Sequence, residues 1–170
     1  YRYPDDKSLN ENGVRGIYLG NFIKWDPAVQ HKQMVNQYGY KASKFNRTFD
    51  TYDYVDCFNY MNIHDLLKLF KHGYSKITDH ACREIRFKRI SRNRAIDLVK
   101  SHENKKILYA KRFAEWLDID QESLFFIMNQ FRNKKYWKKT NINKWSYKGL
   151  SLKIKKYPEK KIKKNIYNYF

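Results

Sequence analysis

The chain has 170 residues, with 36 Lys and Arg residues against 17 Asp and Glu residues, and a formal net charge of +19. This length is enough for one domain with a hydrophobic core. No apolar run is long enough for a signal peptide or a membrane span, and two distant cysteines in no CxxC pair argue against a disulfide framework and against zinc.

The positive charge is unevenly spread along the chain. A charge of this size normally indicates nucleic acid, an anionic membrane or an acidic partner. After Glu122, however, the only acidic residue is Glu159, so the body of the chain is closer to balance than the total suggests. The chain begins at Tyr1 and not at Met. We therefore expect a piece of a longer soluble, cytoplasmic protein without a membrane partner or a bound metal.

A short apolar run near the start predicts a buried strand. Ile17, Tyr18 and Leu19 stand between Gly16 and Gly20, which is typical of a strand bounded by turns. The glycines of this region fit neither GxGxxG nor a P-loop, and GKS, GKT and SGGxDS occur nowhere in the chain. We therefore expect no nucleotide-phosphate cradle within these 170 residues.

Three polar or aromatic residues follow the predicted strand. Asn21, Trp25 and Asp26 stand where open α/β sheets place their ligands, so we take them as candidate substrate-binding residues. Asp26 before Pro27 is also an ordinary helix start, and that simpler interpretation accounts for Asp26 but not for Trp25.

Apolar spacing and capping residues predict a mostly helical chain after Asp26. The stripe of Ile63, Leu66, Leu67 and Phe70 predicts a core-facing helix, and His64 and Asp65 at its start are expected as surface caps and not as metal ligands. Glycine ends the first two helices, and Asp120 caps the last. The predicted helices cover 27–38, 60–72, 78–88, 92–101, 108–117 and 121–131.

The stretch from Gly73 to Lys100 holds the densest mixture of ionisable residues. Thr78 is the expected N-cap of one helix and Ser91 that of the next. On the first of these helices two pairs lie four apart and share a face, His80 with Glu84 and Asp79 with Arg83. Such a turn between helices can hold an anionic ligand, or it can be a solvated lattice of salt bridges.

The last segment differs from the rest. From Asn133 onward, lysines alternate with aromatic residues and no helical stripe is sustained. Lysine with aromatic residues is the combination that single-stranded nucleic-acid binders use, but no RNP-like motif accompanies it. We expect a basic tail that is solvated or docks on a partner, with a nucleic-acid-binding module as the alternative.

Several blocks of the sequence resemble a known family, the N-acetyl sugar amidotransferases of pseudaminic-acid (PseA-type) and lipopolysaccharide (WbpG-type) biosynthesis. The blocks are GVRGIYLGNFIKWD at Gly13–Asp26, YGY at Tyr38–Tyr40, TFDTYDYVDCFNYMNIHDLLKLFKHGYSKITDHACREIR at Thr48–Arg86, and ISR at Ile90–Arg92. The resemblance covers roughly residues 1–131. Lys88 and the pair Asn93-Arg94 depart from the pattern, so the charge pattern of the second helix differs from that of the family.

The resemblance implies a fold and a reaction. Complete members look like PP-loop (HUP-like) ATP pyrophosphatases, so this chain would be the C-terminal portion: the end of an α/β core at 1–26, a helical domain at 27–131 and the basic tail at 132–170. The implied reaction is the ATP-dependent conversion of a sugar acetamido group to an acetamidino group, as in flagellin or lipopolysaccharide glycans. A glutaminase partner would supply ammonia, and ATP with Mg²⁺ would bind mainly to the N-terminal half.

The reaction needs cations for phosphates and sugar carboxylate, a proton acceptor for ammonia, and polar groups that orient the sugar or sugar nucleotide. We expect four arginines to serve as the cations, namely Arg83, Arg86, Arg89 and Arg92. The proton acceptor is expected among His80, Asp79 and Glu84, and the sugar is expected to contact Asn21, Trp25 and Asp26. The fragment alone should be inactive.

Overall fold

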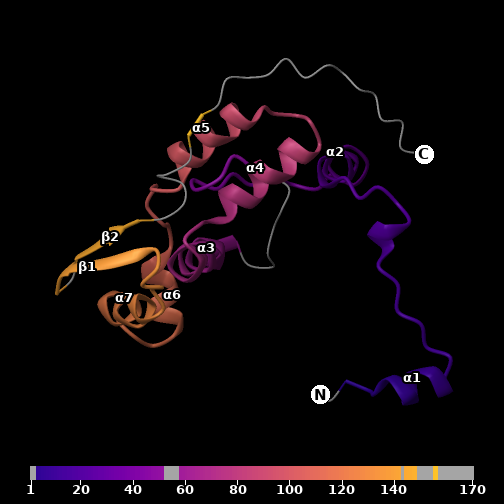
Figure 1. The fold of residues 1–170 in the computed structure, drawn as a ribbon, viewed down its shortest axis with the longest axis horizontal. Coiled ribbons are helices and arrows are strands. Elements are labelled where there is room, and N and C mark those ends of the chain that lie inside the picture. Colours follow the sequence, from indigo (N-terminus) through magenta and orange to yellow (C-terminus); the bar gives the residue numbers. More distant parts are fainter. Residues whose placement is uncertain (1–2, 52–57, 143, 149–154, 157–170) are drawn as a thin grey trace. The chain divides into compact units, whose positions relative to one another are not determined.

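The computed structural model describes residues 3–51, 58–142, 144–148 and 155–156. It divides the chain into two compact units, Tyr1–Lys41 and Ala42–Phe170. The described elements are α1 (Asp6–Glu11), a 3-10 turn (Leu19–Asn21), α2 (Pro27–Tyr38), α3 (Phe58–His72), α4 (Lys76–Arg86), α5 (Arg92–His102), α6 (Ala110–Trp116), α7 (Gln121–Gln130), β1 (Trp137–Asn141) and β2 (Lys144–Tyr147) (Figure 1). The prediction of a mainly helical fold is confirmed. None of the described helices is both long and apolar enough to cross a membrane.

The first unit holds two helices without a core of its own. Asp26 caps α2 through the N–H groups of Ala28 and Val29, and Gly39, with φ of 64°, ends it. The predicted helix at 27–38 is thus confirmed with both of its caps. None of the described residues of this unit is buried.

The strand predicted at residues 17–19 is wrong. Ile17 and Tyr18 have no regular structure, and Leu19 opens the 3-10 turn. The side chain of Ile17 is 61% exposed and that of Leu19 is 51% exposed. A strand forms only when a neighbouring strand takes up its backbone N–H and C=O groups, and no described segment of this unit does so.

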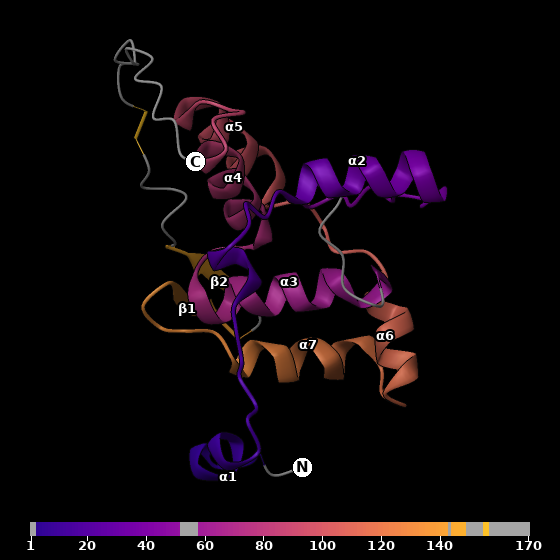
Figure 2. The same ribbon diagram turned by 90° about the vertical axis from the view of Figure 1, so that its right-hand side faces the viewer.

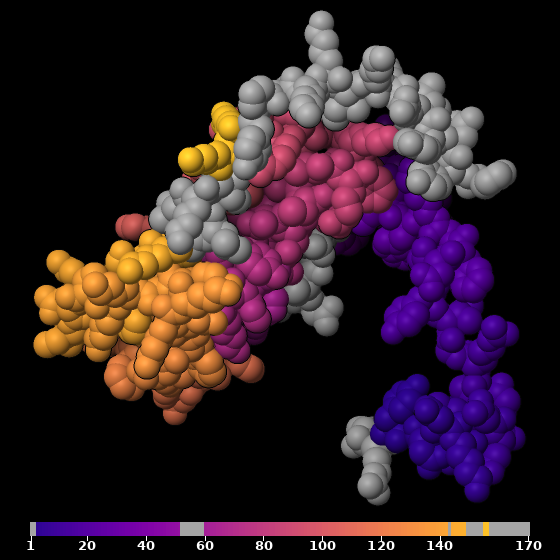
Figure 3. All heavy atoms as spheres, in the orientation of Figure 1, coloured from indigo at the N-terminus to yellow at the C-terminus, as the bar shows by residue number. Residues whose placement is uncertain are grey.

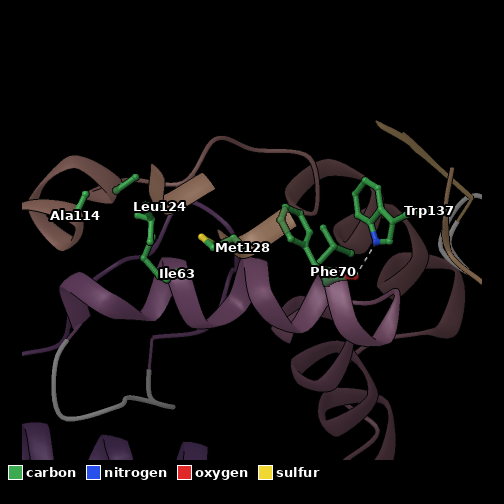
Figure 4. Packing of buried hydrophobic residues seen from close by; sticks show 8 residues of the cluster. Ile63, Phe70, Ala114, Leu124, Met128 and Trp137 are labelled. Carbon is green, nitrogen blue, oxygen red and sulfur yellow. Dashed lines mark hydrogen bonds between the residues drawn. The ribbon is translucent and has the colours of Figure 1, made fainter. Parts of the chain in front are cut away.

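A cluster that we call the aromatic core lies at one end of the second unit. It is enclosed by α3, α6, α7 and the hairpin of β1 and β2 (Figures 1 and 2). Figure 4 shows its side chains along α3, with the indole N–H of Trp137 donating to the carbonyl of Leu69 at 3.2 Å. Its buried members are Ile63, Leu69, Phe70, Ala110, Ala114, Leu124, Met128 and Trp137. Leu66 and Leu67, which we predicted as core, are only partly buried against it.

At the other end, α4 and α5 pack on each other around a smaller cluster. Ile77 and Ala81 of α4 contact Ala95 and Val99 of α5 within it. Ser91 caps α5, as predicted, because its hydroxyl accepts the N–H of Arg94 at 3.2 Å.

The start of α4 differs from the prediction. Its N-cap residue is Ser75, and Thr78, the expected cap, lies within the helix. The side chain of Ser75 makes no capping hydrogen bond. Instead the carboxylate of Asp65, on α3, accepts the N–H of Lys76 at 2.6 Å. A residue distant in sequence has thus taken over the capping role, and Asp65 is a buried cap and not the surface cap that we expected.

The segment predicted as a basic tail contains the hairpin. β1 and β2 pair antiparallel, with Trp137 opposite Tyr147 and Lys139 opposite Trp145. Trp137 is buried, and the hydroxyl of Tyr147 donates to the carbonyl of Gly73 at 2.7 Å. The aromatic residues of this stretch therefore face the core while the intervening lysines face solvent. The remaining residues of that predicted tail, 149–154 and 157–170, lie outside the described residues.

Candidate functional site

His80 lies inside the second unit, on α4, against the segment that precedes α3. Its side chain is 2% exposed. The Nδ1 atom lies 2.7 Å from the hydroxyl of Thr48, and Nε2 lies 3.9 Å from the carboxylate of Asp50. The Thr48 hydroxyl also accepts the N–H of Asp50 at 3.2 Å. Both ring nitrogens therefore face residues 48–50, and these contacts attach the 48–50 segment to α4.

The carboxylate of Asp50 is shared with an arginine. A terminal N–H of Arg83 donates to it at 2.5 Å, while Nε of the same guanidinium donates to Glu84 at 3.0 Å. A terminal N–H of Arg89 donates to the other carboxylate oxygen of Glu84 at 3.2 Å. We call this set, Thr48, Asp50, His80, Arg83, Glu84 and Arg89, the buried ionic network. Asp50 and Glu84 are 1% and 6% exposed, whereas Arg89 is 29% exposed and is the member that reaches solvent most.

A second buried ion pair lies beside the first. Nε of Arg47 donates to Asp65 at 2.5 Å, and another of its N–H groups donates to the carbonyl of Lys105. Because Asp65 also caps α4, this pair connects the 47–50 segment, α3, α4 and the loop before α6. Charges this deep are tolerated only when they are paired and hydrogen bonded, so the two pairs fix one arrangement of these elements.

A family model described as LPS biosynthesis protein WbpG-like, C-terminal domain, matches residues 42–153. The chain belongs to this family. No curated protein matches the chain.

The boundaries of the WbpG-like C-terminal domain agree with those of the fold. The family match begins at residue 42, where the second compact unit also begins. It includes the buried ionic network, the aromatic core and the hairpin. Residues 1–41 therefore lie before the domain, both by the family match and by the division of the fold into two units.

The predicted site residues on α4, on α5 and in the turn between them have different surroundings within the WbpG-like domain. His80, Arg83, Glu84 and Arg89 meet in the buried ionic network. Asp79 instead forms a surface pair with Lys68. The other two predicted arginines, Arg86 and Arg92, are exposed. Arg86 lies on the surface of α4, and Arg92 donates to the carbonyl of Lys155 at 3.2 Å.

The other three predicted site residues belong to the first unit. Asn21 lies in the 3-10 turn, Trp25 is 53% exposed, and Asp26 caps α2. His80 and its neighbours belong to the second unit. A pocket that contains these residues together with Asn21, Trp25 and Asp26 therefore stays a prediction. Within the described ranges, no three His, Cys, Asp or Glu side chains gather closely enough to hold a metal ion.

Sequence reasoning missed the partners of His80. Thr48 and Asp50 entered the prediction only as part of the block of family resemblance, and Arg47 was not singled out at all. A usable signal was present, because TFD at 48–50 opens the longest block of the family resemblance. Residues 52–57 of that block lie outside the described residues.

Proposed function

We propose that this chain is the C-terminal part of an ATP-dependent sugar amidotransferase, which converts an N-acetyl (acetamido) group to an acetamidino group during lipopolysaccharide or related glycan synthesis. The observation that carries the proposal is membership of the WbpG-like family over residues 42–153. The resemblance of Thr48–Arg86 to N-acetyl sugar amidotransferases supports the specific reaction.

The proposed chemistry explains why a second, ATP-binding half is needed. An amide carbonyl is a poor electrophile, and transfer of AMP to its oxygen with loss of pyrophosphate makes that oxygen a leaving group. Ammonia then attacks the carbon, AMP departs, and the nitrogen loses its extra proton. The present chain has no phosphate-cradling sequence, so ATP and Mg²⁺ would bind mainly to the N-terminal PP-loop half of the same protein.

Burial limits what His80 can do in this reaction. Its two ring nitrogens face Thr48 and Asp50, so accepting a proton from ammonia would require the 48–50 segment to move. We propose that His80 is a positioning residue that holds this segment on α4. Glu84 and the more exposed Asp79 remain the alternatives for the proton acceptor. Arg86, Arg89 and Arg92 remain our candidates for holding phosphate or sugar carboxylate, whereas Asp50 and Glu84 already accept the N–H groups of Arg83.

The first unit supports the proposal of an N-terminal partner half. It carries exposed apolar side chains, among them Ile17, Phe22 and Trp25, and has no buried residue in its described range. Apolar area of this kind normally lies against another surface. We propose that residues 1–41 pack on the ATP-binding half, and that Asn21, Trp25 and Asp26 contact the sugar there.

The test uses the full-length protein, which includes the ATP-binding half, with ATP, ammonia and a panel of sugar nucleotides that carry N-acetyl groups. We expect AMP release that requires both ammonia and one of these sugars, together with a product in which NH replaces the acetamido oxygen. A glutaminase added with glutamine should replace free ammonia. Failure of every N-acetyl sugar to produce ammonia-dependent AMP would refute the proposal.

Two substitutions in the full-length protein separate the roles of His80. If His80 only positions the 48–50 segment, His80→Gln, which keeps a hydrogen bond to Thr48, should retain near-normal turnover. His80→Ala should then lose stability together with activity. A loss of about a hundredfold in the Gln variant with unchanged stability would instead identify His80 as the proton acceptor.

A further inference from the structure

A large groove crosses the aromatic end of the second unit, away from the buried ionic network. Its volume is about 1840 Å³, and its walls come from α3, the segment 103–111, α7 and the hairpin. Seven of its lining residues are Lys or Arg, and two are Glu. Figure 3 shows the hairpin in orange on this end of the unit, beside α7. The groove is therefore positively charged overall, and anionic ligands are the ones it favours.

Arg132 lies in the wall of this groove, just after α7, among aromatic rings. The guanidinium carbon is 3.4 Å from the ring centre of Phe70, 4.0 Å from that of Trp137 and 5.3 Å from that of Trp145. Burial lowers the pKa of this guanidinium to about 10, which leaves it protonated at neutral pH. The ring faces stabilise the charge and fix the plane of the guanidinium.

The hydrogen bonds of Arg132 are incomplete within the described residues. Nε donates to the side-chain carbonyl of Asn129 at 2.7 Å, and no carboxylate of the described chain forms an ion pair with Arg132. One terminal nitrogen, Nη1, is buried without an acceptor. A partly buried guanidinium with an unused buried donor is costly unless an acceptor approaches it. Arg83 shows the contrast, because two carboxylates accept its N–H groups.

A second cation approaches the same aromatic ring as Arg132. The ammonium group of Lys139, on β1, is 6.0 Å from the ring centre of Trp145, the same ring that Arg132 approaches. Like charges repel, so two cations at one ring favour an anion close to that ring. Oxygens of a phosphate group suit both partners, since they accept paired N–H groups from a guanidinium and single N–H groups from an ammonium.

We propose that Arg132 and Lys139, held around Trp145, form a binding site for a phosphate-bearing ligand. Exposed apolar side chains line the same groove, notably Phe126 on α7, which is 68% exposed, and Ile142 beyond β1, which is 80% exposed. The ligand therefore carries a phosphate or diphosphate next to an apolar or aromatic portion. A free nucleoside diphosphate and a lipid phosphate share this chemistry. The site rests on its own contacts and does not depend on the amidotransfer proposed above.

Calorimetric titration of the full chain with inorganic pyrophosphate tests the site. Arg132→Lys keeps the charge but loses the planar pair of donors, and we expect it to weaken binding about tenfold or more. Lys139→Gln should weaken binding about fivefold. The matched control is Lys138→Gln, because Lys138 is the neighbouring exposed residue of β1 but does not line the groove. Each variant is first checked by denaturant unfolding, so that loss of binding is compared only between folded proteins.

The outcomes separate a built site from general attraction of anions. Selective weakening in the Arg132 and Lys139 variants supports the proposal. Equal weakening in Lys138→Gln and Lys139→Gln, wild-type binding by Arg132→Lys, or no binding by the folded wild-type chain overturns it. Titrations with UDP and with phosphatidic-acid vesicles then distinguish the source. Tighter binding of one of these, lost in the same two variants, supports the site and identifies a nucleotide or a lipid phosphate.

Discussion

The two ends of the second unit hold partly buried arginines in opposite ways. Around α4, Arg83 is surrounded by the carboxylates of Asp50 and Glu84, and the positive charge is neutralised within the protein. Under the hairpin, Arg132 is surrounded by the rings of Phe70 and Trp137, and the described chain supplies no carboxylate to it.

The two arrangements have different consequences. One fixes the fold, and the other leaves N–H groups of a guanidinium available to a ligand. A guanidinium between carboxylates has its donors engaged, so it specifies how the 48–50 segment, α4 and the turn after it fit together. A guanidinium stacked on rings has its plane fixed while most of its N–H donors stay unused. The first arrangement serves structure, whereas the second is prepared for a ligand. Four sets of substitutions test this comparison.

The largest expected effect is at the aromatic end. Phe70 is 2% exposed and its ring supports the guanidinium of Arg132, so Phe70→Ala should lower the free energy of unfolding by about 3–5 kcal/mol. Phe126→Ala is the control, because this phenylalanine is 68% exposed and its loss should change stability by less than about 0.5 kcal/mol. Urea unfolding measures both. Equal effects would mean that the aromatic core is not the main source of stability.

The polar end should respond nearly as strongly. Asp50→Asn removes the charge that Arg83 contacts at 2.5 Å, leaving a buried cation only partly paired, and should cost about 3 kcal/mol. The surface pair of Lys68 and Asp79 provides the comparison, since Asp79→Asn should cost less than about 1 kcal/mol. If the two Asn variants unfold at the same urea concentration, the buried ionic network does not specify the fold.

Gly73 allows the hairpin to approach α3. Its φ is +70°, and a Cβ atom there would lie 2.4 Å from Cγ of Tyr136. Gly73→Ala should therefore cost about 2–4 kcal/mol, from backbone strain and from displacement of the tyrosine ring. A double-mutant cycle with Tyr136→Ala separates the two contributions. Full additivity in this cycle would contradict the close contact.

The smallest effect concerns the caps of α4 and α5. Ser91 caps α5 with its own hydroxyl, so Ser91→Ala should cost about 1 kcal/mol. Ser75 stands at the same position of α4, but Asp65 supplies the capping oxygen and the Ser75 hydroxyl has no partner among the described residues. Ser75→Ala should accordingly change stability by less than about 0.5 kcal/mol in thermal or urea unfolding. A larger loss than that of Ser91→Ala would reverse the assignment.

The helices, the strand prediction and the hairpin show which parts of the structure are determined by local sequence. The helices were predicted within a few residues, because apolar spacing and caps such as Asp26 and Ser91 act over one or two turns. The strand at 17–19 and the cap at Thr78 were wrong, because strand pairing and the Asp65 cap depend on segments far away in sequence. The hairpin was missed although KWSYK alternates, because its lysines suggested a tail.

The candidate site follows the same rule. Local spacing correctly brought together His80 and Glu84 on one buried face of α4. It also placed Asp79 and Arg83 four apart on a shared face, but it did not indicate their ion-pair partners, which are Lys68 for Asp79 and Asp50 for Arg83. Long-range ion pairs are chosen by packing, and a single sequence contains no direct signal for them.

The agreement of two boundaries at residue 42 has a practical consequence for handling this protein. Every member of both hydrophobic clusters lies between residues 49 and 147. By contrast, residues 3–41 hold most of the large apolar side chains that are exposed in the described chain. Such side chains promote self-association at high concentration. A shortened protein that starts at Ala42 should therefore keep its cooperative unfolding and remain monodisperse at concentrations where the full chain precipitates.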